Sequence, residues 1–196
     1  MALKSNGGGL IKKVTSLREL RMLMKDFGVD TSTWGRDKAK TLTHLFCEVR
    51  DGECALAVTD DGRLVREVSV LCLDIEYKGM VLREDFQLFY EGKRRREREL
   101  DASTGEKFKP GETPEQALSR LVNEEFPILS LQPKEDFKFT GDKFRESDSV
   151  SYPGLHTRYR LCFFAVELTV ELPAITVQEP DKLVAYKWVA SPTRST

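Results

Sequence analysis

The first quarter of the chain shows the helical spacing of apolar residues twice. The first segment begins at Ser16, where Glu19 completes a capping box, and Gly28 is suited to end it in a left-handed conformation. Its apolar stripe consists of Leu17, Leu20, Leu23, Met24 and Phe27. A second stripe, made of Leu42, Leu45, Phe46 and Val49, closes near Gly52. The pattern predicts a helical hairpin over residues 12–52, preceded by a flexible, glycine-rich tail over residues 1–11.

From Cys54 onward the spacing changes to that of strands. Runs of apolar and β-branched residues cover 54–59, 64–77 and 80–90, and the turns Asp61-Gly62 and Lys78-Gly79 separate them. Further runs at 137–144 and 158–170 lie on either side of a polar loop, and 183–189 resembles a last strand. The order of elements predicts an α+β domain with a mixed sheet over residues 53–196.

The most clearly delimited helix lies between these strands, from Pro114 to Phe126. Thr113 is a natural N-cap, Pro114 suits the first helical position, and Gln116 completes a capping box. Pro127 ends the pattern. We expect this helix to pack on the sheet with its apolar stripe, which includes Leu118 and Val122, buried.

Composition and charge narrow the classes of protein that remain. The chain is 40% hydrophobic and 32% charged, which is typical of a globular protein, and its net charge of -1 gives no global attraction to nucleic acid or acidic membranes. Its four cysteines, Cys47, Cys54, Cys72 and Cys162, lack the paired spacing of a zinc or redox site. No signal peptide or membrane-spanning run is evident, so we expect a cytoplasmic protein without a membrane partner.

One segment departs from this nearly neutral charge balance, because residues 93–98 contain five basic side chains and a single acidic one, Glu97. Such a run could attract phosphates, but no aromatic residue is interleaved with it. The sequence therefore favours a solvated loop, and nucleic acid is not an expected partner.

The segment 105–126 carries the pattern that bears most directly on chemistry. Glu112 is followed after seven residues by Arg120, then by Val122 and the pair Glu124-Glu125. Together with the lead-in Pro110-Gly111-Glu112-Thr113-Pro114, this pattern resembles the Nudix box, G-x5-E-x7-R-E-U-x-E-E-x-G-U, in which U is a bulky aliphatic residue. The resemblance extends over about residues 54–190, including Trp188 in a late strand. It implies a Nudix-like mixed sheet between helices, with the N-terminal helical hairpin outside the shared core.

Three positions depart from the box. Glu106 and Pro127 stand where it has glycine, and Leu121 stands where it has the glutamate that follows the arginine. On a helix, positions 121, 124 and 125 fall within an arc of about 100°, so a complete box projects three carboxylates from one face. Such a face can hold Mg²⁺ or Mn²⁺, which clamps a diphosphate and activates water. Leu121 removes the central carboxylate.

The resemblance implies the roles of the remaining box residues. Arg120, Glu124 and Glu125 would be catalytic, and Glu112, Glu124 and Glu125 would hold the metal if the site is active. A later carboxylate, Glu146 or Asp148, could replace the missing ligand. The alternative is that Arg120 and Glu124 form an ordinary surface ion pair at i, i+4.

The loop at 145–159 is the expected ligand-binding segment, because polar and aromatic residues gather there between two strands. We expect Arg145, Tyr152, His156 and Arg158 to bind ligand. His156 is either a general base or a plain hydrogen-bonded histidine.

Three functions remain open. The first is a Nudix-like protein that binds a nucleotide-like or phosphorylated ligand, or a protein, with weak or no hydrolysis. The second is an active Mg²⁺-dependent pyrophosphohydrolase of nucleoside diphosphate-linked compounds. The third is an interaction protein that acts through its N-terminal helices. Because a fold does not determine a function, the choice among the three depends on the defective box. The missing glutamate favours the first function, ligand binding with weak or no hydrolysis.

Overall fold

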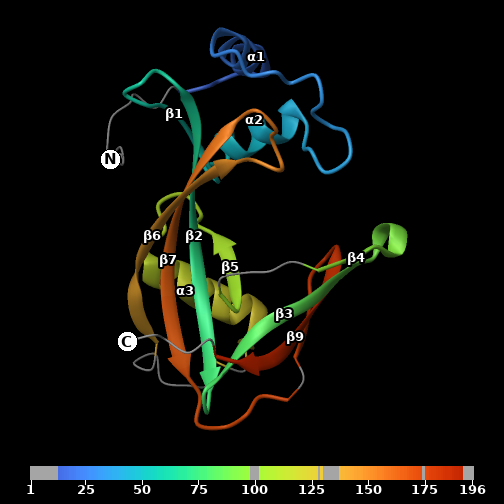
Figure 1. The fold of residues 1–196 in the computed structure, drawn as a ribbon, viewed down its shortest axis with the longest axis vertical. Coiled ribbons are helices and arrows are strands. Elements are labelled where there is room, and N and C mark those ends of the chain that lie inside the picture. Colours follow the sequence, from blue (N-terminus) through green and yellow to red (C-terminus); the bar gives the residue numbers. More distant parts are fainter. Residues whose placement is uncertain (1–12, 98–101, 128, 130–136, 174, 192–196) are drawn as a thin grey trace. The chain divides into compact units, whose positions relative to one another are not determined.

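The computed structural model describes residues 13–97, 102–127, 129, 137–173 and 175–191, and the predicted tail over residues 1–11 lies outside them. The described chain, drawn as a ribbon in Figure 1, divides into two compact units by its internal contacts. Unit 1 consists of residues 1–70, 107–111 and 143–161, and unit 2 of residues 71–106, 112–142 and 162–196. The predicted boundary between residues 52 and 53 stays a prediction.

Unit 1 contains the two predicted helices, α1 (Leu17–Asp26) and α2 (Leu42–Arg50). The Ser16 hydroxyl accepts a hydrogen bond from the Glu19 amide at 3.2 Å, and Gly28 follows α1 with a φ of 67°. Thr41 caps α2, with the His44 ring completing the capping box. Strand β1 (Ala55–Val58) pairs antiparallel with the first residues of β2 (Leu64–Tyr77). The N-terminal helical hairpin is therefore confirmed.

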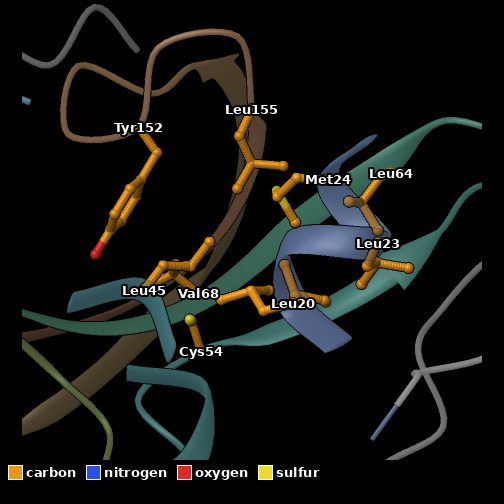
Figure 2. Close-up of a cluster of buried hydrophobic side chains, with 10 residues drawn as sticks. Leu20, Leu23, Met24, Leu45, Cys54, Leu64, Val68, Tyr152 and Leu155 are labelled. Atoms are coloured by element: carbon orange, nitrogen blue, oxygen red, sulfur yellow. The ribbon is translucent and has the colours of Figure 1, made fainter. Parts of the chain in front are cut away.

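The core of unit 1 joins segments that are far apart in the sequence (Figure 2). The apolar stripe of α1, with Leu20 fully buried, packs with residues of α2, β1 and β2 and with the loop that contains Tyr152 and Leu155. The Trp34 ring lies 5.2 Å from the Tyr152 ring, and its Nε1 donates to the Pro153 carbonyl at 2.9 Å. The helices and this late loop share one hydrophobic core.

A buried ion-pair network lies beside that core. The Glu48 carboxylate is 2.6 Å from Lys40 Nζ, 2.6 Å from Arg66 Nη2 and 3.6 Å from Lys107 Nζ. The Arg66 guanidinium lies 5.2 Å from the centre of the Tyr152 ring. Burial alone would raise the pKa of Glu48, but the three cations together lower it to about 2. Glu48 is therefore ionised at neutral pH although it is buried.

Gly52, at the end of α2, provides a test of local packing in unit 1. Its φ is 72°, and a Cβ at this position would lie 2.5 Å from Pro110 Cγ. Gly62 has a similar φ of 79° with nothing within 4 Å of such a Cβ. We expect Gly62→Ala to cost about 1 kcal/mol from backbone strain, and Gly52→Ala to cost about 1–3 kcal/mol more. Urea unfolding of both variants measures the difference, and equal losses would contradict the close approach of Pro110.

Unit 2 contains most of the sheet and the third helix. β3 (Met80–Phe89) pairs antiparallel with β9 (Lys182–Ala190), and β9 with β8 (Thr176–Gln178). A register shift interrupts β3 between Glu84 and Phe86. Unit 2 also contains η1 (Glu91–Lys93), β4 (Arg95–Arg96), most of β5 (Thr104–Lys107) and α3 (Pro114–Glu125). The strands β6 (Lys138–Asp148) and β7 (His156–Glu167) are divided between the two units, with residues 143–148 and 156–161 in unit 1.

Strands are hydrogen-bonded in the order β6-β7-β2-β3-β9-β8, with β1 and β5 added to β2 and β4 to β3. This confirms the predicted α+β class. The predicted loop at 145–159 is shorter than expected, because β6 continues to Asp148 and β7 begins at His156. The short strands β4, β5 and β8 were not predicted, since two to four residues are too few to show a period. Within the described ranges, no helix is long and apolar enough to cross a membrane.

Candidate functional site

The helix α3 positions the residues of the box. The Thr113 hydroxyl accepts from the Gln116 amide, the Gln116 side chain accepts from the Thr113 amide at 2.9 Å, and Pro114 opens the helix. Four apolar side chains are buried, namely Ala117, Leu118, Leu121 and Val122. The predicted burial of Leu118 and Val122 is confirmed. The N-terminal cap and the buried stripe together fix the orientation of α3 ahead of its C-terminal glutamates.

The three positions that would carry the metal-binding arc have different environments. Leu121 is 0% exposed and belongs to the buried stripe. The Glu124 side chain is 55% exposed, and Glu125 is partly buried. Because Leu121 lies between the two glutamates around the helix, a hydrocarbon side chain occupies the middle of the arc.

In unit 2, the Arg120 guanidinium contacts the carboxylates of three glutamates. Its Nε and Nη2 donate to the two oxygens of Glu112 at 2.7 and 3.0 Å, and its Nη1 pairs with Glu106 and lies 3.7 Å from Glu124. Hydrogen bonds from Arg120 to Glu112 raise the pKa of the guanidinium, with Glu106 adding to the effect. The bidentate pair engages both Glu112 oxygens, so the geometry favours a structural role for Glu112 over the predicted metal-binding role.

Glu125 has a separate set of partners. Its Oε2 accepts from the Thr104 hydroxyl at 2.7 Å and from the Tyr186 hydroxyl at 3.4 Å. Burial raises the pKa of Glu125, and the negative charges of Glu179 and Glu106 raise it further. Glu125 is therefore an acidic group in a partly apolar, negatively charged setting.

Glu179 was missed from the sequence. It directly follows the short strand β8 and precedes the last strand, so it lies on no helical or strand pattern. The available signal was a lone carboxylate in the Glu179-Pro180-Asp181 turn just before a strand that carries Trp188. The carboxylates expected from the sequence were Glu146 and Asp148, which belong to unit 1. There each lies 3.3 Å from a ring nitrogen of His156.

The described carboxylates do not form the three-ligand face of a complete box. Across the residues that the structure describes, no group of three or more His, Cys, Asp or Glu side chains is arranged to hold a metal ion. Leu121 supplies no ligand atom, and Glu112 is engaged by Arg120. These residues therefore do not fit the divalent cation that a complete box would hold.

The four expected ligand-binding residues all belong to unit 1. Arg145 and His156 lie on strands, with Arg145 exposed. Tyr152 is fully buried in the core beside Trp34, and burial raises the pKa of its hydroxyl. Because its ring is inaccessible from the surface, Tyr152 is better explained as a core residue that shapes the loop.

His156 and Arg158 are held by acidic side chains on neighbouring strands. The two ring nitrogens of His156 lie 3.3 Å from Asp148 and 3.3 Å from Glu146. The Arg158 guanidinium donates to Glu146 at 2.7 Å and to Glu67 at 3.3 Å. Glu146 is thus paired with two cationic or polar partners, and Arg158 lowers the pKa of its carboxyl.

A cavity in unit 2 lies next to the residue that contacts Glu125. It has a volume of about 580 Å³, and its lining includes Tyr186 and Trp188 of β9, Leu82 of β3 and Glu171. The Tyr186 ring packs edge-on against Phe126 at 5.2 Å, which holds its hydroxyl toward Glu125. The Trp188 indole donates to the Leu172 carbonyl at 3.3 Å. Two fixed aromatic side chains therefore line a cavity that adjoins the end of α3.

Comparisons with known proteins bear on this arrangement. The family model described as NUDIX domain matches residues 63–191, a range that includes α3, Glu106 and Glu179. Among solved structures, the chain is similar to the E. coli dihydroneopterin triphosphate pyrophosphohydrolase, with 21% identity, 62% of this chain and 80% of that one covered, and a TM-score of 0.41. It is also similar to the C. elegans Ap4A hydrolase, with 14% identity, coverage of 63% and 80%, and a TM-score of 0.34. A comparison with curated protein sequences gave no match.

Proposed function

Because the chain belongs to the NUDIX domain family, we propose that it is a Nudix protein that binds a nucleotide-like or phosphorylated ligand and hydrolyses it weakly or not at all. The observation that carries this proposal is the complete burial of Leu121 between Glu124 and Glu125. A carboxylate missing from the centre of the arc removes both a negative charge and a ligand atom for a hard cation. Without that cation, the diphosphate clamp and the activation of water are weakened.

The cavity beside Tyr186 supports binding of a ligand with a flat aromatic group. Aromatic side chains can stack on planar ligands. When a hydrogen bond already holds such a side chain in one rotamer, little side-chain freedom is lost on binding. The lining of the cavity also includes Glu171, whose carboxylate is a hydrogen-bond acceptor.

The first test is a hydrolysis assay paired with a binding assay. In Mg²⁺ or Mn²⁺, we expect turnover of nucleoside triphosphates, dinucleoside polyphosphates and nucleotide sugars to stay near the uncatalysed background. Calorimetry should detect nucleotide binding, and Trp188→Ala should weaken it by about tenfold as the stacking surface is lost. Val170→Ala, an exposed apolar position in unit 2, is the matched control and should bind like the parent.

An active pyrophosphohydrolase is the second candidate, and one observation favours it. Glu179 and Glu106 are close enough to raise the pKa of Glu125, so two further carboxylates adjoin the acidic end of α3. Robust metal-dependent turnover that is lost in both Glu125→Gln and Glu179→Gln would support this candidate and refute the proposed weak or absent hydrolysis. Glu115→Gln, an exposed carboxylate at the other end of α3, should leave that turnover unchanged.

The third candidate, interaction through the N-terminal helices, receives less support. The apolar stripes of α1 and α2 pack into the core of unit 1, with Leu20, Leu23, Met24 and Leu45 buried. Met22 is the large hydrophobic residue of α1 that is exposed. A single exposed side chain is ordinary on a protein surface and does not make a docking face.

A further inference from the structure

The hairpin formed by β3, η1 and β4 in unit 2 displays four consecutive basic residues, 93–96, all of them exposed. Leu88 pairs with Arg95 and Gln87 with Arg96, and the Phe89 amide donates to the Arg94 carbonyl at 2.9 Å. Figure 1 shows η1 at the tip of this hairpin. The basic run is therefore part of an ordered turn, and its side chains have defined neighbours.

Most of this charge is uncompensated. Throughout the part of the chain that the structure describes, Lys93, Arg94 and Arg96 form no ion pair with a carboxylate. Arg95 pairs with Glu97 at 3.1 Å. Lys93, Arg94 and Arg96 lie within four positions of one another and repel, and a bound anion would reduce this repulsion.

Aromatic side chains of β3 hold two of the guanidinium groups in place. The Arg94 guanidinium lies 4.8 Å from the centre of the Phe89 ring, and that of Arg95 lies 4.0 Å from the centre of the Phe86 ring. Stacking of this kind uses the flat face of the guanidinium. Among the described residues the Arg94 guanidinium forms no ion pair with a carboxylate and can donate to phosphate oxygens, whereas Arg95 donates to Glu97.

Tyr90 adds an exposed aromatic ring to the same turn. Its side chain is 48% exposed, while its backbone is anchored by a hydrogen bond from its amide to the Asp181 carbonyl at 3.0 Å. An exposed ring close in sequence to a basic run suits single strands, in which bases stack on aromatic side chains and phosphates meet basic ones.

We propose that residues 93–96, together with Tyr90, form a binding surface for single-stranded nucleic acid. This reverses the expectation from sequence, which found no aromatic residue within the basic run. The hairpin places Phe86 and Phe89 of β3 against Arg95 and Arg94, and Tyr90 follows β3 as an exposed ring directly before η1. The predominance of arginine fits phosphate, because its planar fork can bind two phosphate oxygens at once. The proposal does not depend on the state of the box.

The test measures binding of a fluorescein-labelled 15-nucleotide oligouridine to the full chain by anisotropy between 50 and 200 mM salt. The charge variant is Arg94→Gln with Arg96→Gln, and it leaves Lys93 in place because the φ of Lys93 is 46°. We expect affinity to fall by about tenfold at 50 mM salt and the salt slope to fall by about 1.4, for two lost phosphate contacts. Tyr90→Ser should weaken binding by about fivefold or more with an unchanged slope.

The matched control is Arg18→Gln with Arg21→Gln, which removes the same charge from exposed positions of α1. This control should bind the oligonucleotide like the parent, and the duplex form of the strand should bind about fivefold more weakly than the single strand. Absence of saturable binding, or equal losses in the two double variants, would overturn the proposal. Equal affinity for duplex, or binding to vesicles of anionic phospholipid without binding to the oligonucleotide, would also overturn it.

Discussion

Leu121→Glu is expected to lower the free energy of unfolding by about 3–5 kcal/mol at neutral pH, because Leu121 is completely buried. An ionised carboxylate at this position loses its hydration and meets the buried stripe of α3. In a chain of this length the loss corresponds to a fall in Tm of about 10 °C or more. Added Mg²⁺ should leave this fall unchanged, since Glu112 is engaged by Arg120 and the neighbouring carboxylates do not complete a metal site.

Two control variants separate the effect of burying a carboxylate from the effect of a change of side chain at position 121 and from that of an added charge on α3. Leu121→Met keeps the volume and polarity of the side chain and should cost less than about 1.5 kcal/mol. Asn123→Glu adds a carboxylate to an exposed position of the same helix, so it should leave the Tm within about 2 °C of the parent. Thermal melts across a Mg²⁺ titration compare the three variants. A Leu121→Glu protein that stays folded and is stabilised by Mg²⁺ more than the parent would mean that position 121 faces a recoverable metal site.

Glu48→Gln is expected to destabilise the protein by about 3–5 kcal/mol at pH 7, because it leaves Arg66 buried without its carboxylate. Glu53→Gln is the matched control, since Glu53 pairs with the same Lys107 at 2.9 Å but is largely exposed. Its removal should cost less than about 1 kcal/mol. In the double variant Glu48→Gln with Arg66→Met, much of the loss should be recovered, because the unpaired buried cation is also removed.

The same carboxylate sets a pH dependence. The pKa of Glu48 is lowered to about 2 in the folded chain from an ordinary value of 4.5, so the unfolded chain binds the proton first as pH falls. The stabilisation is therefore fully present above pH 4.5 and is lost between pH 4.5 and 2. Urea unfolding of the parent should show this loss, and the Glu48→Gln protein should lack it. Identical pH profiles for the two proteins would contradict a lowered pKa of Glu48 in the folded chain.

Features that depend on neighbouring residues could be predicted from the sequence. The boundaries of α3 follow from Thr113, Pro114 and Gln116, which act within one turn of the helix. The long strands β2 and β3 follow from dense β-branched and apolar runs between clear turns. The consequence of Leu121 for the acidic arc also follows from the angular period of a helix alone.

Features that depend on residues far apart in the chain could not be predicted from the sequence. Tyr152 was expected to bind ligand, but it is buried because Trp34, more than 100 positions earlier, packs against it. His156 was assigned to the loop at 145–159, and Arg158 to the overlap of that loop with the predicted strand at 158–170. Their strand partners, Glu67, Glu146 and Asp148, are also charged and give no apolar alternation. The charge of Glu179, from a distant part of the sequence, raises the pKa of Glu125, and no local spacing encodes this effect.

The shared core of unit 1 has a consequence for synthesis on the ribosome. Leu20, Leu23 and Leu45 emerge early, but the residues that complete their burial, Tyr152 and Leu155, are translated more than 100 positions later. At ordinary elongation rates this interval lasts about 5–20 s, which is long compared with the formation of a helix. During that time the apolar faces of α1 and α2 remain available to chaperones or to other nascent chains. Codon-dependent pauses between residues 50 and 150 would lengthen this exposure and raise the risk of aggregation before folding.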